Sequence, residues 1–127
     1  MGIIKAEEKG GISMCNKKEA VEILHQVYDR CNMVFGKIEK CYLYGSYARG
    51  DYHTESDVDI LLTVEMNHEE IEKYRMDVAE VSSDLSLEHD VTVSIAVKPA
   101  EQFERYRDVS PFYQNVVNEG IRYTGRG

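Results

Sequence analysis

The spacing of apolar residues predicts a long helix near the start of the chain. Over residues 17–34, apolar side chains recur every three or four positions, as expected for one face of a helix. Asn16 followed by Glu19 has the pattern of a capping box, and Gly36 is suited to the helix end. We therefore expect a helix over residues 17–34 whose apolar side packs in the core.

Two strands are predicted after this helix, separated by a turn and a polar loop. Residues 38–44 form the first expected strand and residues 57–64 the second. Side chains of the second strand alternate between two faces. One face carries Val58, Ile60, Leu62 and Val64, and the other carries Asp57, Asp59, Leu61 and Thr63. The presence of Leu61 indicates that the aspartate face is partly covered.

The second half of the chain predicts three more helices and two more strands. Asn67 with Glu70 is a second capping box, and the apolar spacing continues it as an amphipathic helix over residues 68–86. Residues 91–97 are rich in β-branched side chains, which is typical of a strand. The remaining expected elements are a short helix from Pro99 to residue 106, a helix from Ser110-Pro111 to Gly120, and a short strand over residues 121–124.

Length and composition indicate a single globular domain. The chain has 127 residues, enough for one core but too few for two ordinary domains. Its 43% hydrophobic and 30% charged content excludes a disordered chain. Residues 1–12 have weak patterning and contain Gly10-Gly11, so we expect a flexible N-terminal arm followed by one domain over residues 13–127.

The sequence also bears on location and redox state. Its apolar runs fall short of the roughly 20 residues that a membrane helix needs, and the N-terminus lacks the apolar centre of a secretory signal. We expect a cytoplasmic protein that does not bind membranes. The cysteines are odd in number and lack C-x-x-C spacing, which indicates reduced, partly buried thiols. They are Cys15, Cys31 and Cys41.

The charge balance restricts the class of partner. A net charge of −8 argues against a protein that holds long nucleic acid by its phosphates. Residues 65–90 contain nine acidic side chains against Lys73 and Arg75, a net charge of −7. This segment is either a solvated helix face or a surface for a basic partner.

The candidate chemistry lies where the first two predicted strands meet the turn between them. Gly45-Ser46 is followed by ten residues and then by Asp57 and Asp59. Residues two apart on a strand point the same way, with Cα atoms roughly 6.5–7 Å apart, so the two carboxylates converge. A cation relieves their repulsion, and Mg²⁺ favours a few carboxylates completed by substrate phosphates and water. Two such ions suit the displacement of pyrophosphate by a hydroxyl.

The turn residues suit the phosphates of the same substrate. Gly45 permits unusual backbone angles and close approach of a phosphate. Ser46 offers a hydroxyl and the exposed N–H groups of a helical turn. Arg49 either bonds phosphate oxygens or pairs with Asp51 or Glu55. Three nearby tyrosines either stack on a base or serve as ordinary core and surface residues. They are Tyr44, Tyr47 and Tyr52.

Together these residues resemble a known signature. The run Gly45-Ser46-Tyr47-Ala48-Arg49-Gly50 with Ser56-Asp57-Val58-Asp59-Ile60 resembles that of the DNA polymerase beta-like nucleotidyltransferase superfamily. Size and element order are similar to its minimal nucleotidyltransferase branch. The resemblance implies an α/β (α+β) fold, a small mixed β-sheet flanked by helices around a polymerase-beta-like palm core. It implies that Asp57 and Asp59 bind the metal and that Gly45 and Ser46 hold the triphosphate.

The resemblance also implies a third carboxylate, on the strand after the intervening helix, which binds the catalytic metal and acts as base. If this acid falls in the middle of the strand, Ser94 takes its place and the site lacks it. If it falls at the start of the strand, Asp90 supplies it. We favour Asp90 as the third catalytic and metal-binding residue.

Members of this branch are often antitoxins paired with HEPN (higher eukaryotes and prokaryotes nucleotide-binding) ribonuclease toxins, and some transfer AMP from ATP to a toxin tyrosine. We therefore expect a magnesium-dependent nucleotidyltransferase that moves AMP from ATP to a hydroxyl of such a toxin. Two alternatives stay open: a non-catalytic antitoxin that only binds its toxin, and transfer to a small molecule such as an aminoglycoside. A homo-oligomer is compatible with the sequence.

Overall fold

The computed structural model describes residues 15–125. Its elements follow one another as α2 (Lys17–Phe35), β1 (Lys40–Tyr44), α3 (Ser46–Arg49), β2 (Val58–Val64), α4 (His68–Glu72), α5 (Arg75–His89), β3 (Val93–Pro99), α6 (Ala100–Tyr106), α7 (Pro111–Glu119) and β4 (Ile121–Arg122). The expected flexible arm over residues 1–12 lies outside the described residues. Within the described part, no helix is long and apolar enough to cross a membrane.

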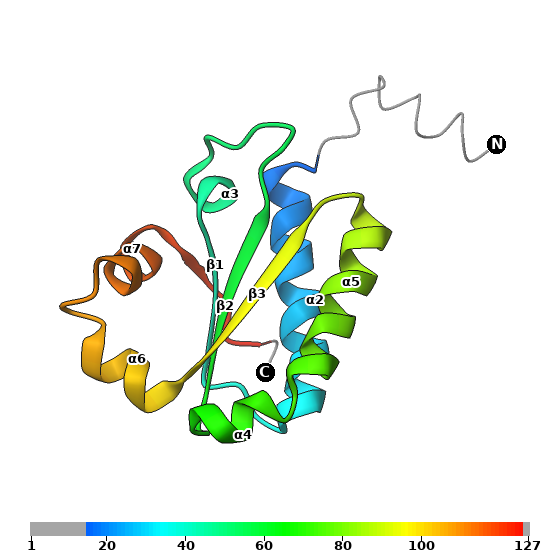
Figure 1. Cartoon of the computed structure of the whole chain (residues 1–127). Helices are drawn as coiled ribbons and strands as arrows, with labels where there is room; N and C mark the ends of the chain where they lie inside the picture. The colour runs from blue at the N-terminus through cyan, green and yellow to red at the C-terminus, as the bar shows by residue number, and fades with distance from the viewer. Residues whose placement is uncertain (1–14, 126–127) are drawn as a thin grey trace.

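A mixed four-stranded sheet forms the centre of the fold, in the order β3-β2-β1-β4 (Figure 1). Strand β1 runs antiparallel to both β2 and β4, and β2 runs parallel to β3. Helices cover both faces of this sheet (Figure 1). This arrangement confirms the predicted mixed sheet flanked by helices.

Helices α2 and α5 cover one face and bury the larger core. Its members include Ile23 and Val27 of α2, Ile60 and Leu62 of β2, and Leu85 of α5. Helix α2 begins where expected, because the Asn16 side chain accepts the N–H of Glu19. Its end is also as expected, since Gly36 takes a left-handed conformation that glycine adopts without strain.

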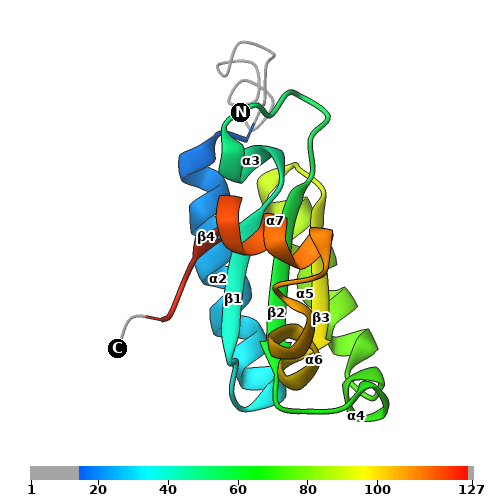
Figure 2. The same ribbon diagram turned by 90° about the vertical axis from the view of Figure 1, so that its left-hand side faces the viewer.

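Helices α6 and α7 cover the other face, on the side that Figure 2 turns toward the viewer. A second core lies beneath them, made of Tyr42, Leu61, Phe103, Tyr113 and Val116. Leu61 is fully buried, which confirms that the aspartate face of β2 is partly covered. Side chains of the two helices pack against Leu61, which follows Asp59 by two residues on the same face of β2.

The predicted helix over residues 68–86 is wrong in one respect, because the chain forms two helices there, α4 and α5. The break comes at Tyr74, whose backbone leaves the helical region with φ −106° and ψ 11°. The Tyr74 ring packs edge-on against Phe35 with centroids 5.2 Å apart. Packing against α2 therefore sets the break, and local helix propensity does not signal it.

The cysteines behave as expected for structural thiols. Cys15, Cys31 and Cys41 are all free and buried. Burial raises the pKa of Cys31 to about 12, so this thiol stays protonated and unreactive at neutral pH.

Candidate active site

The turn after β1 and the aspartates of β2 meet in space. Tyr44 is paired with Asp59 across the two antiparallel strands, so Gly45 follows directly beside Asp59. Gly45 has φ 81° and ψ −155°, a conformation that is essentially restricted to glycine. A Cβ atom at this position would lie 2.7 Å from Oδ2 of Asp59. The glycine therefore leaves room for the carboxylate.

The electrostatics of the aspartate pair favour a bound cation. Asp59 is half-buried, and Asp57 is exposed immediately before β2, which begins at Val58. Burial, followed by the charge of Asp57, raises the pKa of Asp59 to about 6, and the charge of Arg49 opposes this rise. A cation between the carboxylates would remove the penalty for ionising Asp59.

The two aspartates fit magnesium better than a metal that needs a full protein cage. Their donors are carboxylate oxygens, and Gly45 lets the backbone of the turn approach the carboxylate of Asp59 closely. Among residues 15–125, no group of three or more His, Cys, Asp or Glu side chains could hold a metal. Mg²⁺ matches such a donor set, because it takes its remaining ligands from substrate phosphates and water.

The short helix α3 offers donors beside this pair. The N–H groups of Ala48 and Arg49 both donate to the carbonyl of Gly45. The N–H groups of Ser46 and Tyr47 have no acceptor within the described residues, which leaves them available to an anion. The turn thus has two backbone N–H donors without a partner in the described part of the chain, and their binding of phosphates stays a prediction.

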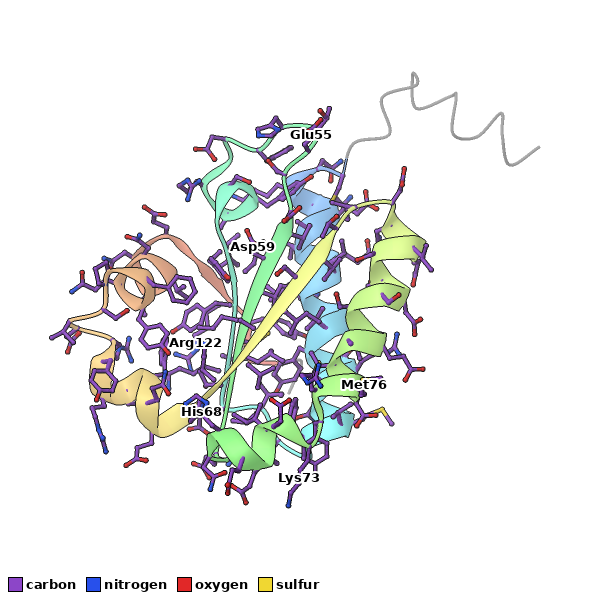
Figure 3. The ribbon with its side chains drawn as sticks, in the orientation of Figure 1. Glu55, Asp59, His68, Lys73, Met76 and Arg122 are labelled. Carbon is purple, nitrogen blue, oxygen red and sulfur yellow. The ribbon has the colours of Figure 1, made fainter. Side chains whose placement is uncertain are left out.

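Arg49 is held over the turn by two carboxylates. Its Nε lies 3.2 Å from Asp51, and its Nη1 lies 3.4 Å from Glu119 at the end of α7. Of the two pairs expected from the sequence, the pair with Asp51 forms. Glu55 instead lies at the tip of the loop, away from Asp59 (Figure 3). The bonds to Asp51 and Glu119 keep the guanidinium near the turn, where a bound phosphate could replace either carboxylate as its partner.

The three tyrosines near the turn are mainly structural. Tyr47 is buried, donates its hydroxyl to the carbonyl of Cys15, and stacks on Tyr52 with ring centroids 4.4 Å apart. Tyr44 is half-buried, and its ring meets Phe112 edge-on at 5.4 Å. Burial and the nearby charge of Asp59 raise the pKa of Tyr44, so its phenol remains protonated.

The structure does not place Asp90 at the start of the third strand. Asp90 is exposed, ends α5 in a left-handed conformation with φ 54°, and precedes β3, which begins at Val93. The residue in register with Asp59 on β3 is Ser94. Asp90 and Asp57 do border one open surface pocket of about 340 Å³. The expectation that Asp90 opens the third strand is therefore wrong, and the residue of β3 beside Asp59 is Ser94. That Asp90 supplies the third carboxylate stays a prediction.

Comparison with known proteins agrees with this geometry. Residues 25–123 match the family described as the nucleotidyltransferase domain. The chain belongs to this family. The match includes the turn of Gly45 and Ser46 and both aspartates of β2, and it confirms the predicted superfamily.

Two relatives of this nucleotidyltransferase come from Methanocaldococcus jannaschii. One, named "Putative protein adenylyltransferase MJ0604", is 36% identical over 85 residues, which is 67% of this chain and 77% of the relative. The other, "Putative protein adenylyltransferase MJ0141", is 36% identical over 77 residues, 60% of this chain and 76% of the relative. The nucleotidyltransferase domain and these two names identify an enzyme, as predicted.

Solved structures share the fold of the nucleotidyltransferase. A protein from Sulfolobus solfataricus, described as "a putative nucleotidyltransferase", superposes with a TM-score of 0.56 at 22% identity, covering 87% of this chain and 84% of that one. A doubly substituted mutant of the toxin–antitoxin MntA-HpeT gives a TM-score of 0.51 at 22% identity over 87% of this chain and 74% of that one. These likenesses confirm the predicted fold class.

Two contacts of the site were not foreseen from the sequence. Glu119 anchors Arg49, and Phe112 packs against Tyr44. Both residues belong to α7, which follows the motif by some sixty positions in the chain. An amphipathic pattern shows that such a helix packs, but it does not show which end of the sheet the helix reaches.

Proposed function

We propose that this nucleotidyltransferase transfers AMP from ATP to a hydroxyl of a partner protein, that the partner is a HEPN-type toxin, and that the chain thereby acts as an antitoxin. The observation that carries the proposal is the meeting of Gly45 with Asp59, which joins a phosphate-binding turn to a carboxylate pair. The names of the relatives support a protein acceptor. The toxin–antitoxin neighbours support a toxin as that acceptor.

In the proposed site, Asp57 and Asp59 hold Mg²⁺, and the free N–H groups of α3 with the Ser46 hydroxyl hold the triphosphate. Bound magnesium supplies positive charge that neutralises the phosphates and favours ionisation of the attacking hydroxyl. Arg49 can exchange Asp51 or Glu119 for a phosphate oxygen, since charge-assisted bonds of this kind form readily at an exposed site.

The proposed transfer forms one bond to phosphorus and breaks one. The acceptor hydroxyl oxygen forms a bond to the α-phosphorus, and the bond from that phosphorus to the bridging oxygen breaks. Pyrophosphate leaves with the electron pair, and the hydroxyl proton passes to water. The products are an adenylylated acceptor and pyrophosphate.

The direct test is intact-mass analysis of the partner toxin after incubation with the chain, Mg²⁺ and each nucleoside triphosphate in turn. We expect an AMP adduct with ATP that is lost in Asp57→Ala and Asp59→Ala. Asp77→Ala is the matched control, because it removes an exposed acidic side chain from the first turn of α5. An adduct that persists in Asp59→Ala would refute the assigned site.

A binding-only antitoxin is the second candidate, and Ser94 favours it. The exposed hydroxyl of Ser94 stands in register with Asp59, where a third carboxylate would complete the metal site. This candidate predicts that the chain neutralises the toxin without an adduct and that neutralisation survives Asp57→Ala and Asp59→Ala. Toxin activity measured in the same incubations separates the two candidates.

A further inference from the structure

The edge of the sheet next to the aspartate pair is open. Strand β3 lies at one end of the strand order and, within residues 15–125, is bonded only to β2. The N–H of Val58 donates to the carbonyl of Thr92, which fixes the direction of the backbone groups that follow. In a parallel ladder these directions alternate, so Val93, Ile95 and Val97 turn their N–H and C=O groups away from β2.

Helix α5 closes the first of these three positions and leaves the other two open. The N–H of Val93 donates to Oγ of Ser86 at 2.9 Å, and Oγ of Ser82 donates to the carbonyl of Val93. No hydrogen bond from any other described residue reaches the outward groups of Ile95 or Val97. Two donors and two acceptors are therefore unpaired along this edge, which is the usual template for an added strand.

An apolar groove of about 470 Å³ runs beside the open edge, between β3 and α5. Ile71, Val78, Ile95 and Val97 are among its apolar lining residues. Asp57 also lines the groove, so the groove is continuous with the candidate active site. A strand added at this edge would place alternate side chains in the groove and the others on the face that carries Asp59.

We propose that the acceptor protein binds as an extended segment added to the edge of β3, with its backbone paired to Ile95 and Val97 and a tyrosine placed beside Ser94. The proposal rests on the proposed function and deepens it by assigning the form in which the acceptor is recognised. The segment has apolar side chains on the groove side and basic side chains on the other.

The distance across the sheet selects tyrosine among the hydroxyl side chains. Neighbouring strands lie about 4.8 Å apart, so a residue beside Ser94 on an added strand is roughly 10 Å from Asp59 across the sheet. The hydroxyl of serine or threonine lies one bond beyond Cβ and falls short of this distance. A tyrosine reaches over Ser94, which is small and exposed.

Charge favours a basic segment. Glu72 and Arg75 line the groove together and pair at 2.6 Å, so their charges largely cancel. The net charge of −8 attracts a basic segment over longer distances.

The test uses a synthetic peptide of alternating valine and lysine with one tyrosine in place of a lysine. Two further peptides carry backbone N-methyl groups, one at the valines and the other at the lysines. In an extended strand the N–H groups of alternate residues point to the same edge, so the peptide N–H groups that face β3 belong either to the valines or to the lysine positions. Methylation of that set blocks pairing with β3, and methylation of the other set does not. Binding is measured with Mg²⁺ and a non-hydrolysable ATP analogue by hydrogen exchange at the amides of Ile95 and Val97, and transfer with ATP is measured by intact mass.

We expect the parent peptide to protect both amides and one of the methylated peptides to lose this protection. Val97→Pro removes one outward N–H without touching the ladder to β2, as proline is tolerated at an edge strand. It should raise the Kd of the peptide roughly three- to tenfold relative to the matched control Val97→Ala, which keeps the N–H. Thermal melts of both variants confirm that they fold.

The outcomes separate the docking proposal from the proposed function. AMP transfer without protection of Ile95 and Val97, or equal binding by all three peptides, overturns strand addition and leaves the transfer chemistry intact. Protection of the two amides without transfer of AMP to the peptide or to the toxin supports strand addition and overturns the transfer. If the two amides are not protected and no AMP is transferred, both the docking proposal and the proposed function are overturned.

Discussion

Substitution of Gly45 by alanine tests the geometry of the site most directly. Its φ of 81° and ψ of −155° lie in a region that costs other residues about 1–3 kcal/mol. In addition, the new Cβ would lie 2.7 Å from Oδ2 of Asp59, closer than real Cβ contacts, so the carboxylate must rotate away. We expect Gly45→Ala to lower the free energy of unfolding by about 1–3 kcal/mol and to lower kcat/KM for AMP transfer about 100-fold, since small displacements of catalytic groups have effects of this size.

Gly36→Ala is the matched control. Gly36 has φ 85°, and a Cβ at this position meets nothing within 4 Å. The variant should lose about 1–2 kcal/mol of stability from backbone strain alone and keep the transfer rate of the wild type. Urea unfolding measures the stability of both variants, and transfer is assayed well below both unfolding midpoints.

A double substitution separates the clash from the strain. In the background of Asp59→Ala no carboxylate opposes the new methyl group, so Gly45→Ala should then cost less stability than it does in the wild type, because only the backbone strain remains. If Gly45→Ala transferred AMP as fast as Gly36→Ala, the turn and Asp59 would not depend on each other, contrary to this prediction.

Further variants test the charges and the buried polar groups. Because the folded pKa of Asp59 is about 6 against 3.8 ordinarily, its ionisation destabilises the fold increasingly as pH rises through this window. In thermal melts without metal, Asp59→Asn should therefore stabilise the protein at pH 8, by on the order of 1 kcal/mol after allowance for solvent screening, and not near pH 3. Ser94→Asp should tighten Mg²⁺ binding about tenfold in calorimetry, because it would add a third carboxylate in register with Asp59. Asp90→Asn should leave both Mg²⁺ binding and stability unchanged, because asparagine tolerates the positive φ of this helix end. Thr63→Val should raise the free energy of unfolding by about 1 kcal/mol, since Oγ1 of Thr63 is buried without a partner; a loss in urea unfolding would contradict this account.

Elements fixed by local chemistry were predictable from the sequence. The side chain of Asn16 and the conformation of Gly36 delimit α2, and the Asn67–Glu70 capping box begins α4. The alternation in β2 correctly separated the core face from the aspartate face, because a strand has only two faces. The motif predicted that the turn and the aspartates form one site, and the antiparallel register of β1 and β2, which pairs Tyr44 with Asp59, brings them together.

Features that depend on contacts between elements were not predictable in this way. The break at Tyr74 follows from its packing on Phe35. The start of β3 depends on Asp90 adopting a positive φ and on Ser86 capping the N–H of Val93. A β-branched run gives the approximate position of a strand, but its register against a parallel neighbour is set by hydrogen bonds. The position of Asp90 outside β3 and of Ser94 beside Asp59 therefore required the structure.

The hydrophobic core determines the geometry of the candidate site. A shift of β2 by one residue against β1 would turn Asp59 to the face of α2 and α5 and turn Ile60 to the aspartate face. Ile60 and Leu62 are fully buried on the first face, and Leu61 is fully buried on the second. Such a shift would place Asp59 in an apolar core, where an unpaired carboxylate is strongly disfavoured. The same apolar side chains that stabilise the sheet thus hold Asp59 against Gly45, and the open edge of β3 is the side from which an acceptor can approach them.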